Sequence, residues 1–235
     1  MSAERLDKII SSQFNISRSQ ARKEILSGKV SVMGKPVRQS GFSVDVQVQI
    51  VSFAGQTVEY KKYVYILMNK PAGVLSASND KHRQTVVDLV PEHLRRPNLF
   101  PVGRLDKDTT GLLIITDDGD FAHKVLSPKS GIFKTYVAEL DGLVTDEMCG
   151  IFKDGVTLAD NTRLRGAVLR SLGGVKAEIK ISEGRYHQIK RMFGTVGLGV
   201  NALHRSALGK LTLPDWLSAG ESCELTVDEI GGIFK

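Results

Sequence analysis

A stretch with little apolar character, residues 53–63 (FAGQTVEYKKY), separates two parts of the chain that can each form a core. This stretch has few large apolar side chains and no regular hydrophobic period, which is typical of a connection between domains. With 235 residues, of which 41% are hydrophobic, the chain is long enough to bury a small core and a medium one. We therefore predict two domains, at residues 1–58 and 64–235.

The first 50 residues have the pattern of a small helix–hairpin domain. Two sets of apolar residues have helical spacing, namely Leu6, Ile9, Ile10 and Phe14, followed by Ala21, Ile25 and Leu26. Ser17 precedes the second set and has Gln20 three residues after it, which indicates a capping box. Valines flank a Gly34–Lys35 turn, which predicts a hairpin. The alternating apolar residues at 44–50 predict a half-buried strand.

Positive charge is concentrated near the N-terminus. The net charge of the chain is +6, and residues 1–40 hold eight Lys or Arg against three Asp or Glu, a surplus of five. Arg18 and Arg22 lie four residues apart on the second predicted helix, so they share a face. A polyanion such as nucleic acid is the natural partner of such a face, and we predict that both arginines bind RNA. A solvated basic face without a partner is the alternative.

The rest of the chain mixes short strands with helices. Apolar runs and alternation predict strands near residues 65–68, 112–115, 135–138 and 175–181, and helices near 120–126 and 189–196. Because no regular βαβ repeat is present, the predicted fold class is α+β. No apolar run approaches the roughly 20 residues of a membrane helix, and the N-terminus lacks the apolar core of a secretion signal. We expect a cytoplasmic protein that does not enter a membrane.

The densest group of polar residues is the loop Gly103–Gly111 (GRLDKDTTG), directly before a predicted buried strand. Asp106 lies inside this loop, where a carboxylate can act as a nucleophile, a general base or a metal ligand. A capped structural turn explains the spacing equally well. Asp117, Asp118 and Asp120 follow the strand; they could bind Mg²⁺, but a turn that leads into a helix N-cap explains them more simply.

A second polar group occupies residues 183–191 (EGRYHQIKR). Arg185 lies near a strand-to-helix junction, where its guanidinium can pair with a buried carboxylate or bind phosphate. Lys190 and Arg191 add positive charge that suits RNA, and the alternative is a solvated basic helix face. Tyr136, at the start of a predicted strand, can stack on a base, although a core tyrosine with its hydroxyl at the surface is the commoner case.

No motif predicts a metal or a cofactor. The five histidines are scattered and the two cysteines, Cys149 and Cys223, are isolated, so no group has the ligand spacing of a zinc site. The glycine-bracketed loop is not a phosphate-binding P-loop, because no Gly-Lys-Ser/Thr follows at the required spacing. We therefore expect no metal and no cofactor.

Four segments taken together resemble one family. GRLDKDTTGLL, SPKSGIFKTY, ISEGRYHQIKRMF and LHR, in this order, are similar to the motifs of the ribosomal RNA pseudouridine synthases of the RsuA type. The head of the chain (RLDKII…SRSQARKEILSGKVSVMGKPV) resembles the small RNA-binding domain first seen in small-subunit ribosomal protein four. The resemblance covers the whole chain, and it implies a catalytic domain with a central mixed, largely antiparallel sheet.

The resemblance also implies roles for individual residues. The family detaches a uracil base from its sugar, turns it and rejoins it through carbon, after flipping the nucleotide out of the RNA structure. Asp106 matches the essential aspartate, and Tyr136 matches the tyrosine that stacks on the flipped base. Arg185 matches the basic residue that pairs with the catalytic carboxylate. Arg104 matches the arginine that fills the vacated stack, and Ile181 matches an apolar wall beside the base.

The implied function is the isomerisation of uridine to pseudouridine in ribosomal RNA by an aspartate nucleophile, and YHQIKRMF and LHR favour the small-subunit 16S RNA as substrate. The implied partner is ribosomal RNA or a pre-ribosomal particle, bound by a monomer that needs no small-molecule cofactor. Three alternatives stay open: a pseudouridine synthase that acts on 23S RNA, a non-catalytic RNA-binding factor of ribosome assembly, and a metal-dependent nuclease built on Asp108, Asp117, Asp118 and Asp120.

Overall fold

A computed structural model describes residues 3–234 of the chain, which fall into two compact units. The first unit holds the chain up to Val64 together with Glu92–Leu99, and the second holds Tyr65–Pro91 and the chain from Phe100 onward. The domain extents given above, 1–58 and 64–235, stay predictions, and their outermost residues (1, 2 and 235) lie outside the described residues. Each unit is described below by itself.

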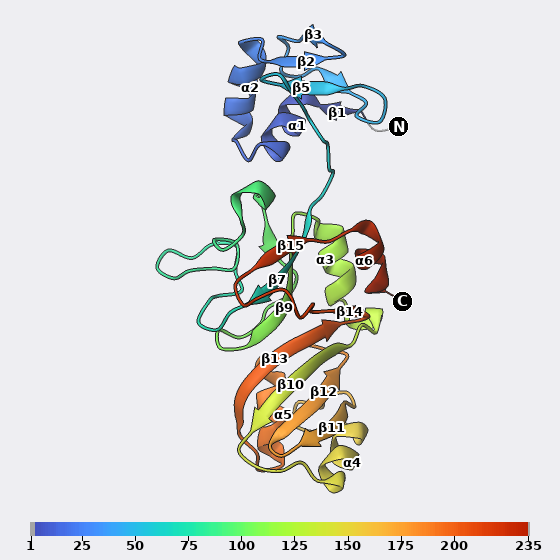
Figure 1. Cartoon of the computed structure of the whole chain (residues 1–235). Helices are drawn as coiled ribbons and strands as arrows, with labels where there is room; N and C mark the ends of the chain where they lie inside the picture. Colours follow the sequence, from blue (N-terminus) through green and yellow to red (C-terminus); the bar gives the residue numbers. More distant parts are fainter. Residues whose placement is uncertain (1–2, 235) are drawn as a thin grey trace. The chain divides into compact units, whose positions relative to one another are not determined.

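The first unit packs two helices against a small sheet (Figure 1). Its elements are β1 (Glu4–Arg5), α1 (Leu6–Gln13), α2 (Arg18–Leu26), β2 (Val30–Val32), β3 (Lys35–Pro36), β4 (Ser43–Val44), β5 (Val51–Phe53), β6 (Gln56–Thr57) and the 3₁₀ turn η1 (Glu92–Leu94). The sheet has the antiparallel order β3-β2-β5-β6, and β1 pairs with β4. Leu6, Ile9 and Ile25 are fully buried in one core with Val30 and Val51, so the helix–hairpin prediction for this part is confirmed.

The structure of this unit differs from three of the local predictions made from the sequence. Ser17 caps α2 by accepting a 3.1 Å hydrogen bond from the backbone N–H of Gln20, which is one half of the predicted capping box. Leu26, at the end of α2, is 56% exposed and does not belong to the buried stripe. The expected linker also starts too early, because β6 lies within residues 53–63 and pairs with β5 across a two-residue Ala54–Gly55 turn.

The predicted strand at 44–50 is wrong. β4 ends at Val44, and a turn at 46–48 follows. Asp45 causes this break, because its Oδ1 accepts a 3.1 Å hydrogen bond from the backbone N–H of Gln47. Side-chain bonds of this kind compete with the strand ladder for backbone groups. Val48 consequently stands 70% exposed.

The second unit is built on a nine-stranded sheet (Figure 1). Its elements are β7 (Tyr65–Lys70), β8 (Phe100–Pro101), β9 (Thr110–Thr116), α3 (Gly119–Leu126), η2 (Pro128–Ser130), β10 (Lys134–Leu140), α4 (Asp146–Asp154), β11 (Val168–Gly173), β12 (Lys176–Ile181), α5 (Gln188–Thr195), β13 (Val200–Leu208), β14 (Leu211–Thr212), β15 (Ser222–Glu224) and α6 (Val227–Gly232). The main path runs β11-β12-β10-β13-β9-β7-β15, with β14 on β13 and β8 on β9. β9 and β13 are parallel and the other described neighbours are antiparallel, which confirms the mixed, largely antiparallel sheet.

Helices cover the sheet where the apolar periods predict them. Phe121 and Val125 of α3 pack into one core cluster with Leu67 of β7 and Leu112 of β9. Asp118 caps α3 by accepting hydrogen bonds from the first backbone N–H groups of the helix, as the turn interpretation of the acidic run predicts. Within residues 3–234, no helix is both long and apolar enough to cross a membrane.

Candidate active site

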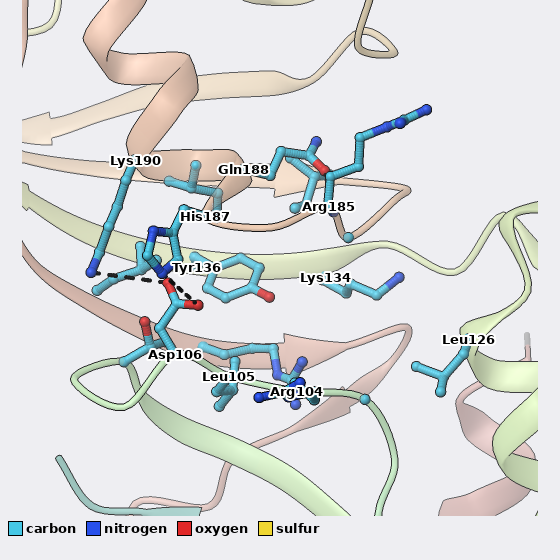
Figure 2. A pocket seen from close by; sticks show the side chains of 17 residues that line it. Arg104, Leu105, Asp106, Leu126, Lys134, Tyr136, Arg185, His187, Gln188 and Lys190 are labelled. Carbon is cyan, nitrogen blue, oxygen red and sulfur yellow. Dashed lines mark hydrogen bonds and ion pairs between the residues drawn. The ribbon is translucent and has the colours of Figure 1, made fainter. Parts of the chain in front are cut away.

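A pocket in the second unit collects most of the residues that the sequence singled out (Figure 2). Its empty space is about 640 Å³, a figure that includes the open solvent at its mouth. Three parts of the chain form its walls: the loop 103–109 before β9, the segment 184–190 that leads into α5, and one face of β10, β12 and β13.

Asp106 lies in the loop before β9 with its carboxylate between two basic side chains. His187 Nε2 is 3.6 Å from Asp106 Oδ1, and Lys190 Nζ is 3.9 Å from Asp106 Oδ2 (Figure 2). His187 itself has a left-handed backbone, with φ at +48°, as the N-cap residue of α5. The turn into α5 therefore aims both basic side chains at the loop, and the carboxylate stays 28% exposed toward the pocket.

Lys70, at the end of β7, fixes the loop from below. Its ammonium donates hydrogen bonds of 2.9 to 3.0 Å to three backbone carbonyl oxygens, those of Pro71, Lys107 and Thr109. The side chain is completely buried. Burial lowers the pKa of Lys70 to about 8, against the opposing influence of Asp108 and Asp106. Because the contacts join both sides of Asp108, Lys70 sets the path of the chain that carries Asp106.

Ser76 provides a second support for the same loop. Its Oγ donates a 2.9 Å hydrogen bond to the carbonyl oxygen of Leu105 and accepts a 3.1 Å bond from the backbone N–H of Leu105. Both residues are buried. Asp106 thus follows a residue whose backbone donor and acceptor are both satisfied, which is a rigid base for a reactive side chain.

The sheet face below the loop carries Tyr136. Tyr136 of β10 is paired with Arg205 of β13 in the strand register, so the two side chains lie next to each other on one face. Lys134, two residues before Tyr136, shares this face, and Ile181 of β12 is its register partner. All four residues are buried and line the pocket. The arrangement agrees with the expected apolar wall at Ile181 and with a stacking role for Tyr136, which stays a prediction.

The predicted ion pair between Arg185 and Asp106 is absent from the described structure. Arg185 Nε lies 3.6 Å from Glu183 Oε2, and its guanidinium points away from Asp106 (Figure 2). Glu183 is held in place by Gln188, whose Nε2 donates a 3.3 Å hydrogen bond to Glu183 Oε1. A carboxylate two residues away thus binds the arginine, while His187 and Lys190 occupy the space beside Asp106.

The other predicted RNA-binding residues of this unit differ in position. Arg104 lines the pocket and is exposed, as a residue that meets RNA requires. Lys190 also lines the pocket, through its contact with Asp106. Arg191 binds Asp160 instead, by a short ion pair outside the pocket wall. An RNA contact of Arg191 therefore stays a prediction that the geometry does not favour.

The predicted RNA-binding arginines of the first unit share one carboxylate. Asp7 of α1 is fully buried and accepts hydrogen bonds from Arg5, Arg18 and Arg22. Burial acts to raise the pKa of Asp7, but the bonds from the three arginines outweigh it and hold the pKa well below its ordinary value. The arginine side chains stay about half exposed. The cluster has an excess of two positive charges and free N–H groups for phosphate.

The acidic residues of the nuclease alternative do not gather into a metal site. No group of three or more His, Cys, Asp or Glu side chains within residues 3–234 has the geometry to hold a metal ion. Asp118 is committed to capping α3 and also accepts a 2.6 Å hydrogen bond from the Tyr65 hydroxyl.

Four residues that sequence reasoning left outside the site belong to it. Their side chains contact the loop that carries Asp106 or line the pocket, and they are Lys70, Lys134, His187 and Arg205. His187 lies in the polar group 183–191, and Lys134 and Arg205 lie in the segments SPKSGIFKTY and LHR that carry the resemblance, so their positions gave a usable signal. Lys70 follows an apolar run, at a position where a lysine is normally exposed, and only its burial in the structure distinguishes it.

Comparisons with known proteins agree with this geometry. Residues 64–195 match the family model described as RNA pseudouridylate synthase, and residues 4–50 match the S4 domain. An uncharacterized RNA pseudouridine synthase of Bacillus subtilis is 38% identical over 230 residues, which cover 96% of each chain. Ribosomal small subunit pseudouridine synthase A of Escherichia coli strain K12 is 37% identical over 230 residues, or 97% of this chain and 99% of the relative.

A solved structure described as a crystal structure of pseudouridylate synthase is also similar. It is 33% identical, has a TM-score of 0.69, and the match covers 97% of this chain and 99% of that chain. The family model covers the pocket walls formed by the loop 103–109, by β10 and β12 and by the segment 184–190, and relatives match over nearly the full length. The chain therefore belongs to the RNA pseudouridine synthase family, whose members are isomerases, and it carries an N-terminal S4 domain.

Proposed function

We propose that this chain converts a uridine of small-subunit ribosomal RNA to pseudouridine, with Asp106 as the catalytic carboxylate. The observation that carries the proposal is the position of Asp106, on a braced loop that lines the same pocket as Tyr136. The small-subunit target is supported by the names of relatives from Escherichia coli and Salmonella typhimurium, both called ribosomal small subunit pseudouridine synthase A.

The residues divide the work according to their exposure. The buried face with Tyr136 and Ile181 suits a flat base, because it offers an aromatic ring and an apolar wall. The exposed Arg104 and the arginine cluster of the S4 domain suit phosphate groups. In this proposal Asp106 meets the substrate between base and sugar, where its carboxylate attacks one of them or takes a proton. The partner is RNA, as free ribosomal RNA or within a pre-ribosomal particle, and the enzyme acts as a cytoplasmic monomer without a cofactor.

The test follows tritium at carbon 5 of uracil, which pseudouridine formation displaces to solvent. Small-subunit ribosomal RNA labelled at this position is incubated with the wild-type chain and with Asp106→Asn. We expect release by the wild type and none by the variant, which keeps the shape of the side chain and loses its charge. Full release by Asp106→Asn would contradict the role of the carboxylate.

Two further arms separate the alternatives. Release from large-subunit but not from small-subunit RNA would assign the chain to the other target. No release from either RNA, or from partly assembled subunits, would favour a non-catalytic assembly factor. Release that persists in EDTA agrees with a reaction independent of divalent metal, and cleaved RNA that disappears with EDTA would indicate the nuclease.

A further inference from the structure

Two buried cations on the pocket face have no carboxylate partner. Arg205 is 3% exposed and Lys134 is 8% exposed, and within residues 3–234 neither has an acidic group at ion-pair distance. A buried charge without an opposite charge is costly in a folded protein. Burial and, after it, the charge of nearby Arg205 lower the pKa of Lys134, while the charge of Glu183, which lies beyond ion-pair distance, acts in the opposite direction. An electron-rich ligand bound to Lys134 and Arg205 would offset this cost.

Their hydrogen-bonding capacity is largely unused. Arg205 donates one hydrogen bond, from Nε to the carbonyl oxygen of Leu112 at 2.6 Å, although a guanidinium has five N–H groups. Lys134 Nζ makes one long contact of 3.5 Å, to the carbonyl oxygen of Ile132. Three buried side-chain atoms lack a hydrogen-bond partner within the described residues, and two of them, Arg205 Nη2 and Thr109 Oγ1, belong to residues of this pocket. The protein alone therefore does not satisfy the hydrogen-bonding groups of this site.

The strand register places both cations beside Tyr136. Arg205 is the cross-strand partner of Tyr136, and Lys134 precedes Tyr136 by two residues on the same face. A base stacked on the ring of Tyr136 would bring its edge to these two side chains. The exposed arginines of the pocket, Arg104 and Arg185, stand at the mouth instead, where the phosphates of the RNA strand remain.

We propose that Lys134 and Arg205 form a subsite that binds the carbonyl oxygens of the uracil base during its isomerisation, an inference that rests on the proposed function. When the bond between uracil N1 and the sugar breaks, its electron pair stays with the base and spreads over the carbonyl oxygens. Rejoining through C5 returns this pair to a new carbon–carbon bond, and the proton lost from C5 is balanced by the one gained at N1. Preorganised cations stabilise the negatively charged detached base more than they stabilise the neutral base of the bound uridine.

The test separates a base contact from a phosphate contact. Single-turnover tritium release from small-subunit ribosomal RNA is measured at saturating RNA, and RNA affinity is measured across salt concentrations. For Lys134→Gln we expect the saturating rate to fall about 100-fold or more, with RNA affinity and its salt dependence unchanged. Lys134→Arg, which keeps the charge, restores most of the rate. Arg104→Gln serves as the comparison, because a phosphate contact at the mouth reduces the slope of log affinity against log salt by about one.

Two results would overturn the subsite. A reduced salt slope for Lys134→Gln with a normal saturating rate would mean that Lys134 binds phosphate, and a normal rate with a normal slope would mean that it touches no substrate. Unchanged RNA affinity and thermal unfolding show that a slow variant is folded. Arg205→Lys is the second variant. If the loss of its hydrogen bond to Leu112 prevents folding, the comparison of Lys134→Gln with Lys134→Arg decides the test alone. A wild-type chain that releases no tritium from any RNA would overturn the proposed function and this subsite together, whereas an active wild type with an equally active Lys134→Gln overturns the subsite only.

Discussion

Lys70 Nζ lies 2.9 Å from the carbonyl oxygen of Thr109 and so joins the end of β7 to the loop that carries Asp106. The same ammonium binds two further carbonyl oxygens, and the side chain is fully buried. A buried cation with three backbone acceptors is a structural anchor. Its loss leaves those carbonyl groups without a donor in a region that water does not reach.

Lys70→Met should therefore destabilise the second unit and slow the reaction. Each hydrogen bond to a charged group contributes roughly 1.5–3 kcal/mol, and since the carbonyls find partial new partners we expect a net loss of about 3 kcal/mol in the free energy of unfolding, measured by urea denaturation. Lys210→Met, at an exposed lysine in the turn after β13, is the control and should stay within about 0.5 kcal/mol of the wild type. Equal stability of the two variants would show that Lys70 does not anchor the loop.

The buried Asp7 predicts acid sensitivity of the S4 domain. Its pKa in the folded chain is held below the unfolded value near 3.9 by Arg5, Arg22 and Arg18, despite burial. The ionised form thus contributes stability that is present above pH 4 and is lost as the pH falls through the folded pKa. Asp7→Asn should cost about 3 kcal/mol at pH 7 and should remove this part of the acid dependence.

The measurement compares the two chains at pH 7 and pH 3. Urea unfolding followed through the methyl signals of Ile9 and Ile25, both in the core of the S4 domain, reports on this unit alone. The difference in the free energy of unfolding between the wild type and Asp7→Asn should be smaller at pH 3 than at pH 7. A gap that is the same at both values would mean that Asp7 is not ionised in the folded domain. Asp45→Asn, in the turn after β4, is the control that should keep the acid dependence.

Much of the fold could be predicted because its signals are local. The apolar runs of β7 and β9 and the helical period of α5 specify their elements without knowledge of the partners. The loop Gly103–Gly111 could likewise be selected, because its polar residues stand between glycines directly before a buried strand. Alternation alone misled at 44–50, where the side chain of Asp45 satisfies a backbone group and favours a turn.

The missing parts of the site depend on contacts far apart in the sequence. Arg205 meets Tyr136 through a register that no spacing encodes, since the two strands come together only when the sheet forms. The partner of Arg185 could not be predicted for a different reason. A long charged side chain can reach several carboxylates, and here Arg185 pairs with Glu183, two residues away, and not with Asp106.

The arginines around Asp7 should contact RNA phosphates. Replacing Arg18 and Arg22 with Ala removes two half-exposed guanidinium groups, so RNA affinity should fall, and the slope of log affinity against log salt should decrease by up to roughly two. Lys23→Ala removes one charge from a neighbouring face of α2 and is the control for net charge alone. If the double variant keeps the wild-type slope, the S4 domain does not use this face to hold RNA.

Gly111 joins the loop that carries Asp106 to the sheet at a point where no side chain fits. Its φ is +101°, and a Cβ there would lie 2.3 Å from the carbonyl oxygen of Arg205 and 2.8 Å from the Arg205 nitrogen. Gly111→Ala must therefore push β9 and β13 apart, and we expect a loss of at least about 4 kcal/mol together with loss of tritium release. Gly131 is the matched control, because it also has a positive φ, of +66°, but has nothing within 4 Å of a built Cβ. Gly131→Ala should cost only about 1 kcal/mol, for the left-handed backbone. Similar urea-unfolding losses in the two variants would mean that backbone strain alone, and not the approach of Arg205, requires a glycine at 111.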